Sequence, residues 1–129
     1  MLSSEDDLGF YLVRGFNDPN DMGPRVVRLA VGQDIAWDML PNPLARQSVI
    51  SAQSFADLRR WKLASEISER RVVLRDLQIA GRSVPDLTVR ISEAVARLGV
   101  NGMLGFDFFE QFDSVLWMPR TGWLTLRFP

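Results

Sequence analysis

Few kinds of side chain in this sequence could carry acid–base chemistry. The 129-residue chain has no His and no Cys, which excludes Ser–His and Cys nucleophiles, disulfides and the usual zinc ligands. Proton transfer would fall to carboxylates, to Lys62 or to Tyr11. We expect neither a metal site nor a cofactor.

Asp34 and Asp38 are the carboxylates nearest to a proline-containing loop at residues 41–43. They stand four residues apart in a segment that alternates as a strand does, so their side chains share one face. We interpret both as strand residues on the solvent face. A catalytic role for either is the alternative.

The composition is that of one ordinary globular domain. Hydrophobic residues make up 47% of the chain and charged residues 24%, and the length suffices for one core. The net charge of −1 gives no reason to expect a nucleic-acid or membrane partner. There is no apolar run long enough for a membrane span, and the N-terminus is acidic where a signal peptide is basic. We expect a cytoplasmic protein.

The elements that would position any reactive group are mostly short strands. Alternating polar and apolar residues predict the strands, and clusters of Gly, Pro and Asn predict the turns. The predicted strands are residues 9–15, 25–31, 34–40, 48–50, 64–68, 72–79, 83–91, 102–104, 114–118 and 123–128. This many short strands indicates a mostly-β fold, a barrel or a folded sheet.

Turn-forming residues divide the chain and shape the first hairpin. The loop at residues 17–24 separates an N-terminal extension, residues 1–24, from a domain at residues 25–129. Gly32 and Gln33 predict the turn between the first two strands of that domain. Pro41 and Pro43 are expected to end strand pairing, because proline has no amide hydrogen.

Two short helices and a helical turn at residues 92–98 interrupt the strands. Ser51 is a predicted N-cap for a helix at residues 52–61, in which Phe55 and Leu58 face the core. In a helix at residues 106–112, Asp107 would interact favourably with exposed amide groups at the helix start. We interpret four aromatic residues of this helix as core rather than as a binding stripe: Phe106, Phe108, Phe109 and Phe112.

The stretch from residue 102 to 112, Gly-Met-Leu-Gly-Phe-Asp-Phe-Phe-Glu-Gln-Phe, resembles the Gly-x-Leu-Gly-x-Asp-Phe-Leu segment near the C-terminus of retropepsin-like aspartic protease domains. Residues 45–51, Ala-Arg-Gln-Ser-Val-Ile-Ser, resemble the segment that follows the catalytic loop of that family. The resemblance covers about residues 25–128. It implies a closed retropepsin-like barrel with one or two short helices.

The resemblance also implies where a catalytic Asp-Thr/Ser-Gly motif would stand. Counting back from Ala45 places Asn42 at the Asp, Pro43 at the Thr/Ser and Leu44 at the Gly. Two Asp side chains share a proton in such enzymes, and an Asn amide cannot serve as the base. Pro43 offers neither a hydroxyl nor an amide hydrogen, and Leu44 adds a side chain where close approach is needed. We therefore predict no catalytic residues.

A binding surface is predicted around the degenerate motif and two tryptophans. The binding residues that we expect are Asn42, Ala45, Trp117 and Trp123. Trp123 stands on the strand face opposite Leu124, so we expect it, with Trp117, to point outward at an interface. The arginine pairs at residues 59–60 and 70–71 are interpreted as solvated; a patch for phosphate or an acidic partner is the alternative.

These expectations together predict a catalytically inactive aspartic-protease-like domain that serves as a binding or assembly module. Such a domain could hold an extended peptide or a partner segment by strand addition. The resemblance implies a homodimer, because in the family two lobes complete one cleft. One alternative is an active retropepsin-like aspartic endopeptidase with an atypical catalytic loop. Another is a structural subunit of a larger assembly.

Overall fold

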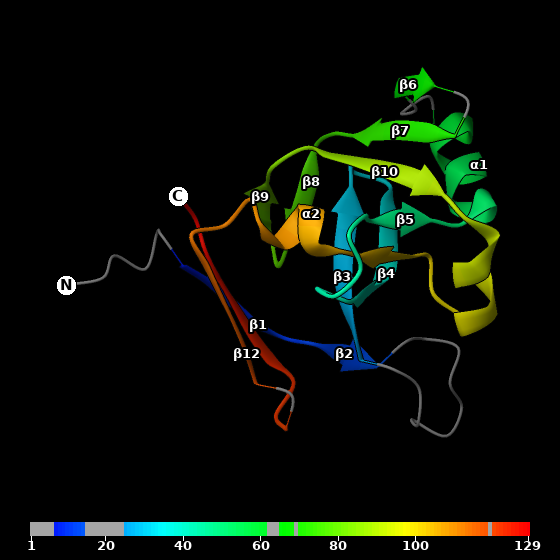
Figure 1. Cartoon of the computed structure of the whole chain (residues 1–129). Coiled ribbons are helices and arrows are strands. Elements are labelled where there is room, and N and C mark those ends of the chain that lie inside the picture. The colour runs from blue at the N-terminus through cyan, green and yellow to red at the C-terminus, as the bar shows by residue number, and fades with distance from the viewer. Residues whose placement is uncertain (1–6, 15–24, 62–64, 69, 119) are drawn as a thin grey trace.

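The computed structural model describes residues 7–14, 25–61, 65–68, 70–118 and 120–129 (Figure 1). The loop expected at residues 17–24 lies outside these ranges. The strands are β1 (Asp7–Tyr11), β2 (Val13–Arg14), β3 (Arg25–Val31), β4 (Ile35–Pro41), β5 (Val49–Ile50), β6 (Ser65–Ser68), β7 (Arg71–Leu74), β8 (Leu77–Ile79), β9 (Arg82–Val84), β10 (Leu87–Ile91), β11 (Gly102–Leu104), β12 (Ser114–Met118) and β13 (Trp123–Arg127). The helices are α1 (Ala52–Arg60), the 3-10 helix η1 (Glu93–Leu98) and α2 (Phe106–Phe109).

The mostly-β architecture is confirmed, whereas the strands of the described residues do not close into the expected barrel. The larger sheet has the order β6-β7-β10-β5-β11-β4-β3-β8-β9, with β2 added to β3, and a separate sheet has the order β1-β13-β12. Within the described residues, the end strands β6 and β9 pair only with their hairpin partners β7 and β8. The larger sheet therefore has two open edges.

The hairpin of β3 and β4 forms as expected around a turn in which Gly32 has φ 63°. Val27, Leu29 and Val31 bury one face of β3 in the main core, whereas Val26 on the other face is buried in a second, smaller cluster. The expectation that Pro41 ends the pairing is wrong, since β4 continues beside β11 with Pro41 opposite Leu104. Pairing with β3 stops earlier, at Val27 and Met39, so no partner strand is there to need the missing amide hydrogen.

Two strands predicted as long and continuous each break in the middle. The expected strand 72–79 divides into β7 and β8 at Asp76, whose φ of 56° lies in the left-handed region. The expected strand 83–91 divides into β9 and β10 beside Pro85. The halves have different partners: β7 pairs with β10, whereas β8 pairs with β9 and β3. The turn expected at residues 80–82 is present, with left-handed Ala80 and Gly81.

The helices follow their sequence signals closely. The Ser51 hydroxyl accepts the Ser54 amide hydrogen at the start of α1, and Leu58 is buried against the core. The helical turn expected at residues 92–98 is η1, capped by Ser92. Helix α2 ends at Phe109, earlier than expected; three of its region's four phenylalanines are buried, whereas Phe106 is exposed.

The three-stranded sheet joins the two ends of the described chain. Strand β1 pairs with β13 along its whole length, from Asp7 opposite Arg127 to Tyr11 opposite Trp123. Leu8 and Leu12 are buried in the same hydrophobic cluster as the β3–β4 hairpin. Strands from both sides of residue 24 therefore share one core.

Candidate functional site

The loop at residues 42–48 connects β4 to β5 and lies against β11. Strand β11 runs between these two strands, parallel to β4 and antiparallel to β5 (Figure 1). The loop must therefore turn the chain around the C-terminal end of β11. This places Asn42 beside Leu104, whose carbonyl accepts the Asn42 amide hydrogen at 2.8 Å.

Asn42 uses its polar groups to hold the loop. Its side-chain Oδ1 accepts the Leu44 amide hydrogen at 3.2 Å, which forms a local turn. Its Nδ2 lies 3.5 Å from the Met103 sulfur, and its carbonyl accepts the Ala45 amide hydrogen at 3.1 Å. The Asn42 side chain is thus a structural partner within the loop.

The next two residues of the loop point to solvent. Pro43 is exposed, and Leu44 is 93% exposed, the most of any large hydrophobic residue described. Ala45 is half-buried, and its carbonyl accepts the Phe106 amide hydrogen at 2.7 Å. Of the expected binding residues in this loop, Ala45 therefore has both main-chain groups engaged inside the protein, by Asn42 and by Phe106.

A buried Ser48–Asp107 pair fixes the far end of the loop. Both oxygens of the Asp107 carboxylate accept the Ser48 amide hydrogen at 2.9 Å, and Oδ1 also accepts the Ser48 hydroxyl at 2.6 Å. The same hydroxyl oxygen accepts the Gly105 amide hydrogen at 2.8 Å. The sequence predicted an interaction of Asp107 with the start of its own helix. In the structure, the Asp107 carboxylate binds Ser48, which lies 59 positions earlier. Helix α2 has no side-chain cap.

Gly105 allows the two segments to come this close. A Cβ atom at this position would lie 2.8 Å from the Ala45 carbonyl oxygen and 2.8 Å from the Gln47 carbonyl carbon. These are backbone atoms of the loop, so neither can move aside as a flexible side chain could. The sequence pattern at residues 102–112 includes this glycine, but a local pattern does not predict which distant segment packs against it.

An apolar cavity of about 420 Å³ adjoins the loop and the second sheet. Most of its lining is proline, aromatic or aliphatic, with two carboxylates at the border. The lining residues are Pro41, Pro43, Phe106, Phe109, Glu110, Phe112, Asp113, Ser114, Val115, Trp117 and Leu124. Leu44, which follows the lining residue Pro43 in the sequence, is exposed but does not line the cavity.

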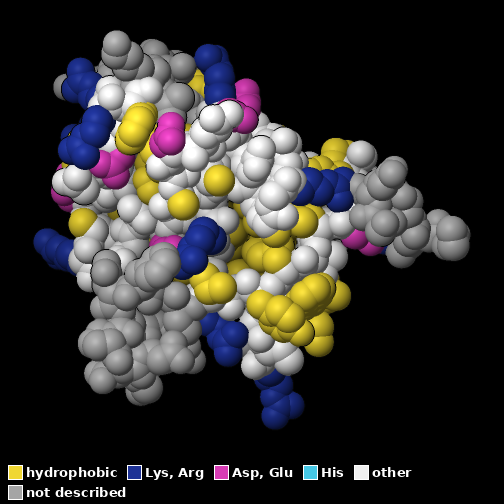
Figure 2. Space-filling model, turned by 180° about the vertical axis from the view of Figure 1, so that it is seen from behind, with side chains coloured by type: hydrophobic (Ala, Val, Ile, Leu, Met, Phe, Trp, Pro, Cys, Tyr) yellow, Lys and Arg dark blue, Asp and Glu magenta, His cyan; other side chains and the backbone are white. Residues whose placement is uncertain are grey.

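Strand β12 borders this cavity and is exposed along its length. It is the edge of the three-stranded sheet, and no strand of the described chain pairs with its outer side. Its four large hydrophobic residues are 38–58% exposed: Val115, Leu116, Trp117 and Met118. In Figure 2, hydrophobic side chains gather at lower right over this part of the molecule. Unpaired apolar edges of this kind are unusual in proteins that remain alone in solution.

The two expected interface tryptophans lie on opposite faces of this sheet. Trp117 is opposite Leu124 in the register and lines the apolar cavity. Trp123 is opposite Met118 and packs over Gly9, edge-to-face with Tyr11 at 4.7 Å between ring centroids. Its Nε1 donates a hydrogen bond to the Thr125 hydroxyl at 2.8 Å. Trp123 is therefore partly covered, and a single surface cannot contain both rings.

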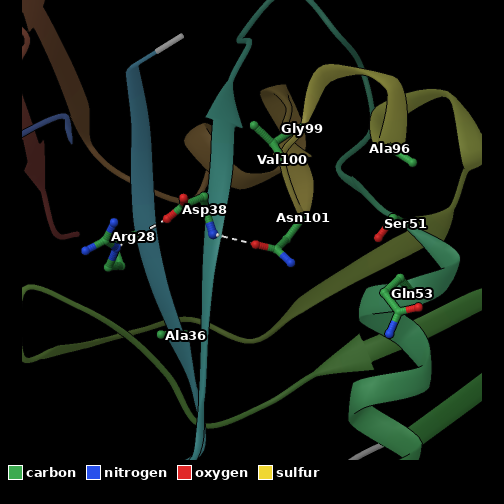
Figure 3. Close-up of a pocket in the computed structure, with 9 residues that line it drawn as sticks. All are labelled: Arg28, Ala36, Asp38, Ser51, Gln53, Ala96, Gly99, Val100 and Asn101. Atoms are coloured by element: carbon green, nitrogen blue, oxygen red, sulfur yellow. Dashed lines mark hydrogen bonds and ion pairs between the residues drawn. The ribbon is translucent and has the colours of Figure 1, made fainter. Parts of the chain in front are cut away.

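Asp38, the alternative catalytic carboxylate, lies in a second cavity of about 570 Å³ (Figure 3). Its Oδ1 pairs with Arg28 Nε at 3.2 Å, and its amide hydrogen is accepted by Asn101 Oδ1 at 2.9 Å. Asp38 is the one carboxylate among the described residues that line this cavity. Asp34 is exposed in the preceding turn. The structure therefore does not bring Asp34 and Asp38 together in one cavity.

No group of three or more acidic residues that could hold a metal ion occurs in the described ranges. Over the same part of the chain, every helix is too short or too polar to cross a membrane.

The fold is similar to that of a known protease. The crystal structure of a retropepsin-like aspartic protease from Rickettsia conorii matches with a TM-score of 0.62, over 95% of this chain and 91% of that chain. The two sequences are 12% identical, so the likeness shows a shared retropepsin-like fold and no more. No protein-family model and no curated protein matches the chain.

Proposed function

We propose that this chain is a non-catalytic domain of retropepsin-like fold that serves as a binding or assembly module. The observation that carries the proposal is that the Asn42 side chain makes hydrogen bonds that hold its own loop. It stands where the resemblance expects the catalytic Asp, and its amide holds the loop through Leu44 and Met103. A neutral amide neither accepts a proton from water nor shares one with a second copy.

The neighbouring residues support the same conclusion. Pro43 cannot supply the hydroxyl or amide hydrogen that would join two such loops, because it has neither. Leu44 places a large apolar side chain in solvent, where an active site would need close backbone approach. Three changes in consecutive residues remove three separate requirements of the reaction.

The apolar surface beside the loop is the part of the molecule that we assign to assembly. Among the described residues, no strand pairs with the outer edge of β12, and its exposed Val115 and Trp117 line the cavity. Antiparallel pairing of β12 with a second copy would cover this edge and extend each three-stranded sheet across a two-fold axis. We propose a homodimer of this kind, whose joint surface can hold an extended peptide segment without cutting it.

One observation bears on the alternative of an active endopeptidase. Glu110 and Asp113 line the cavity beside Pro43, so two carboxylates do lie near the loop. Both are exposed to solvent, and neither stands at the position that the resemblance assigns to the catalytic Asp.

A peptidase assay tests the proposal directly. Wild-type protein is incubated with an unfolded protein substrate between pH 3 and pH 7, with and without pepstatin, and fragments are measured by mass spectrometry. We expect no cleavage, and none from Asn42→Asp alone, because Pro43 and Leu44 remain. The triple variant Asn42→Asp, Pro43→Thr, Leu44→Gly is the positive control, and pepstatin-sensitive cleavage by it would support the proposed register. Pepstatin-sensitive cleavage by the wild type would overturn the proposal.

A further inference from the structure

A polar groove that shares the lining residue Glu110 with the apolar cavity contains an unfavourable arrangement of charge. Arg71 on β7 and Arg90 on β10 are directly opposite each other in the antiparallel register. Like charges at opposed positions of neighbouring strands repel and lower stability, since their Cβ atoms are only about 5 Å apart. Two guanidinium groups placed this way suggest that an anion belongs between or beside them.

A third arginine lies in the same groove. The groove has a volume of about 490 Å³ and includes Arg46, from the loop at residues 42–48, with Arg71, Thr88 and Arg90. Arg90 Nη1 donates to the Gln47 side-chain oxygen at 3.2 Å, which directs this guanidinium towards the loop. Three arginines from three segments of the chain therefore converge on one groove.

The acidic residues of the groove do not neutralise these arginines in place. Within the described residues, no carboxylate lies within ion-pair distance of Arg46, Arg71 or Arg90. Asp107 accepts its hydrogen bonds from Ser48, and Asp86 faces Arg75 with 3.9 Å between Oδ2 and Nε. The remaining acid, Glu110, is exposed at the border of the groove.

The floor of the groove lacks a hydrogen-bond donor. Gln111 donates through Nε2 to the carbonyls of Asp86 and Asp107, at 3.4 and 3.3 Å, which fixes the orientation of its amide. Its Oε1 is buried and has no donor among the described residues. Gln111 is therefore a fixed part of the groove wall, and the arginines are the groups that can meet a ligand; a peptide with acidic side chains carries matching carboxylates.

We propose that this arginine groove (Arg46, Arg71, Thr88, Arg90 and Gln111) binds the carboxylate side chains of an acidic peptide segment. Guanidinium groups bind carboxylates through paired, charge-assisted hydrogen bonds, and an anion beside Arg71 and Arg90 removes their mutual repulsion. The groove adjoins the apolar cavity, with Glu110 lining both, but its arginines are not residues of the degenerate motif, so the proposal does not depend on whether the protein cleaves peptides.

Binding of defined probes tests this site. The probes are a labelled hexapeptide of alternating Glu and Ala with blocked ends, the same peptide with Gln in place of Glu, and inorganic phosphate. Affinities are measured by fluorescence anisotropy or, for phosphate, by competition. We expect the Glu peptide to bind and the Gln peptide to bind at least about tenfold more weakly, with affinity falling as salt is added. Equal binding of both peptides, or stronger binding of phosphate than of the Glu peptide, would overturn the assignment.

Three variants separate the groove from general charge effects. Arg71→Gln and Arg90→Gln should each weaken binding of the Glu peptide about tenfold, whereas Arg120→Gln, in an exposed turn, should change it less than about twofold. Arg71→Gln should also raise the melting temperature of the unliganded protein by about 1–4 °C at low salt, because it removes the repulsion. That increase excludes misfolding as the cause of lost binding. An equal loss with Arg120→Gln, or a lower melting temperature with Arg71→Gln, would contradict the proposal.

Discussion

The carboxylate of Asp107 holds the Ser48 amide and hydroxyl from 59 residues away, at 2.9 and 2.6 Å. The Ser48 hydroxyl oxygen also accepts the Gly105 amide hydrogen. Three polar groups are thereby satisfied in a place where Ser48 is fully buried. The position of the loop that carries Asn42 depends on this pair rather than on a metal or a disulfide.

Ser48→Ala should therefore destabilise the protein by about 2–3 kcal/mol. The change removes the hydroxyl bond to Asp107 and leaves the buried Gly105 amide without an acceptor. Urea unfolding followed by tryptophan fluorescence measures the loss. Ser83→Ala, at an exposed position in β9, is the matched control and should change stability by less than about 0.5 kcal/mol. A similar loss for both variants would contradict this role of Ser48.

Gly105→Ala should destabilise the protein by at least about 2 kcal/mol, because the new methyl group would press on backbone atoms of Ala45 and Gln47 at 2.8 Å. Gly81→Ala provides the comparison. It has free space around it but a φ of 80°, so it should lose only about 1 kcal/mol from backbone strain. Urea unfolding measures both losses in the free energy of unfolding, and we expect the larger loss for Gly105→Ala. A smaller loss for Gly105→Ala than for Gly81→Ala would mean that the loop can shift.

Acid should weaken the pairing of β1 with β13, because it protonates Asp7. The hydrogen bond from Arg127, at 2.9 Å, lowers the pKa of the Asp7 carboxyl below its usual value of 3.8. A carboxyl whose pKa is lowered by folding stabilises the protein above that usual value, and the contribution disappears as pH falls through the lower, folded-state pKa. Melting temperatures from pH 7 to pH 2.5 should fall more steeply for the wild type than for Asp7→Asn. Parallel curves would show that the pair contributes nothing measurable.

Leu116→Lys should convert the proposed homodimer into a monomer. Leu116 is 58% exposed on the β12 edge, and a lysine there would place a positive charge in the proposed dimer interface. Sedimentation velocity at about 100 µM protein measures the oligomeric state. For an interface of standard size, we expect the substitution to raise the dissociation constant of the dimer at least about tenfold. Leu98→Lys, equally apolar and 52% exposed on η1, should leave the dimer intact. A monomeric wild type at this concentration would remove the basis for the dimer.

Local signals in the sequence predicted the local elements well. The β3–β4 hairpin and α1 each have a turn or cap residue next to a regular apolar pattern, and both occur within a residue of the expected bounds. Such features depend on neighbours a few residues away, which a single sequence displays.

Features that depend on distant partners could not be predicted in the same way. The breaks at Asp76 and Pro85 occur because each half-strand has a different partner strand. The role of Asp107 depends on Ser48, and the opposition of Arg71 and Arg90 depends on the register of two strands. Periodicity gives the face of a residue but not the segment that lies against it.

The pairing of β1 with β13 sets the order in which this molecule can be completed. Residues 7–11 have their partners at residues 123–127, so the segment between them must be synthesised before β1 has its neighbour. Closing so long a loop is entropically unfavourable until the intervening sheet has formed. During synthesis, β1 therefore leaves the ribosome before β13 but can be placed in its sheet only after β13 has followed.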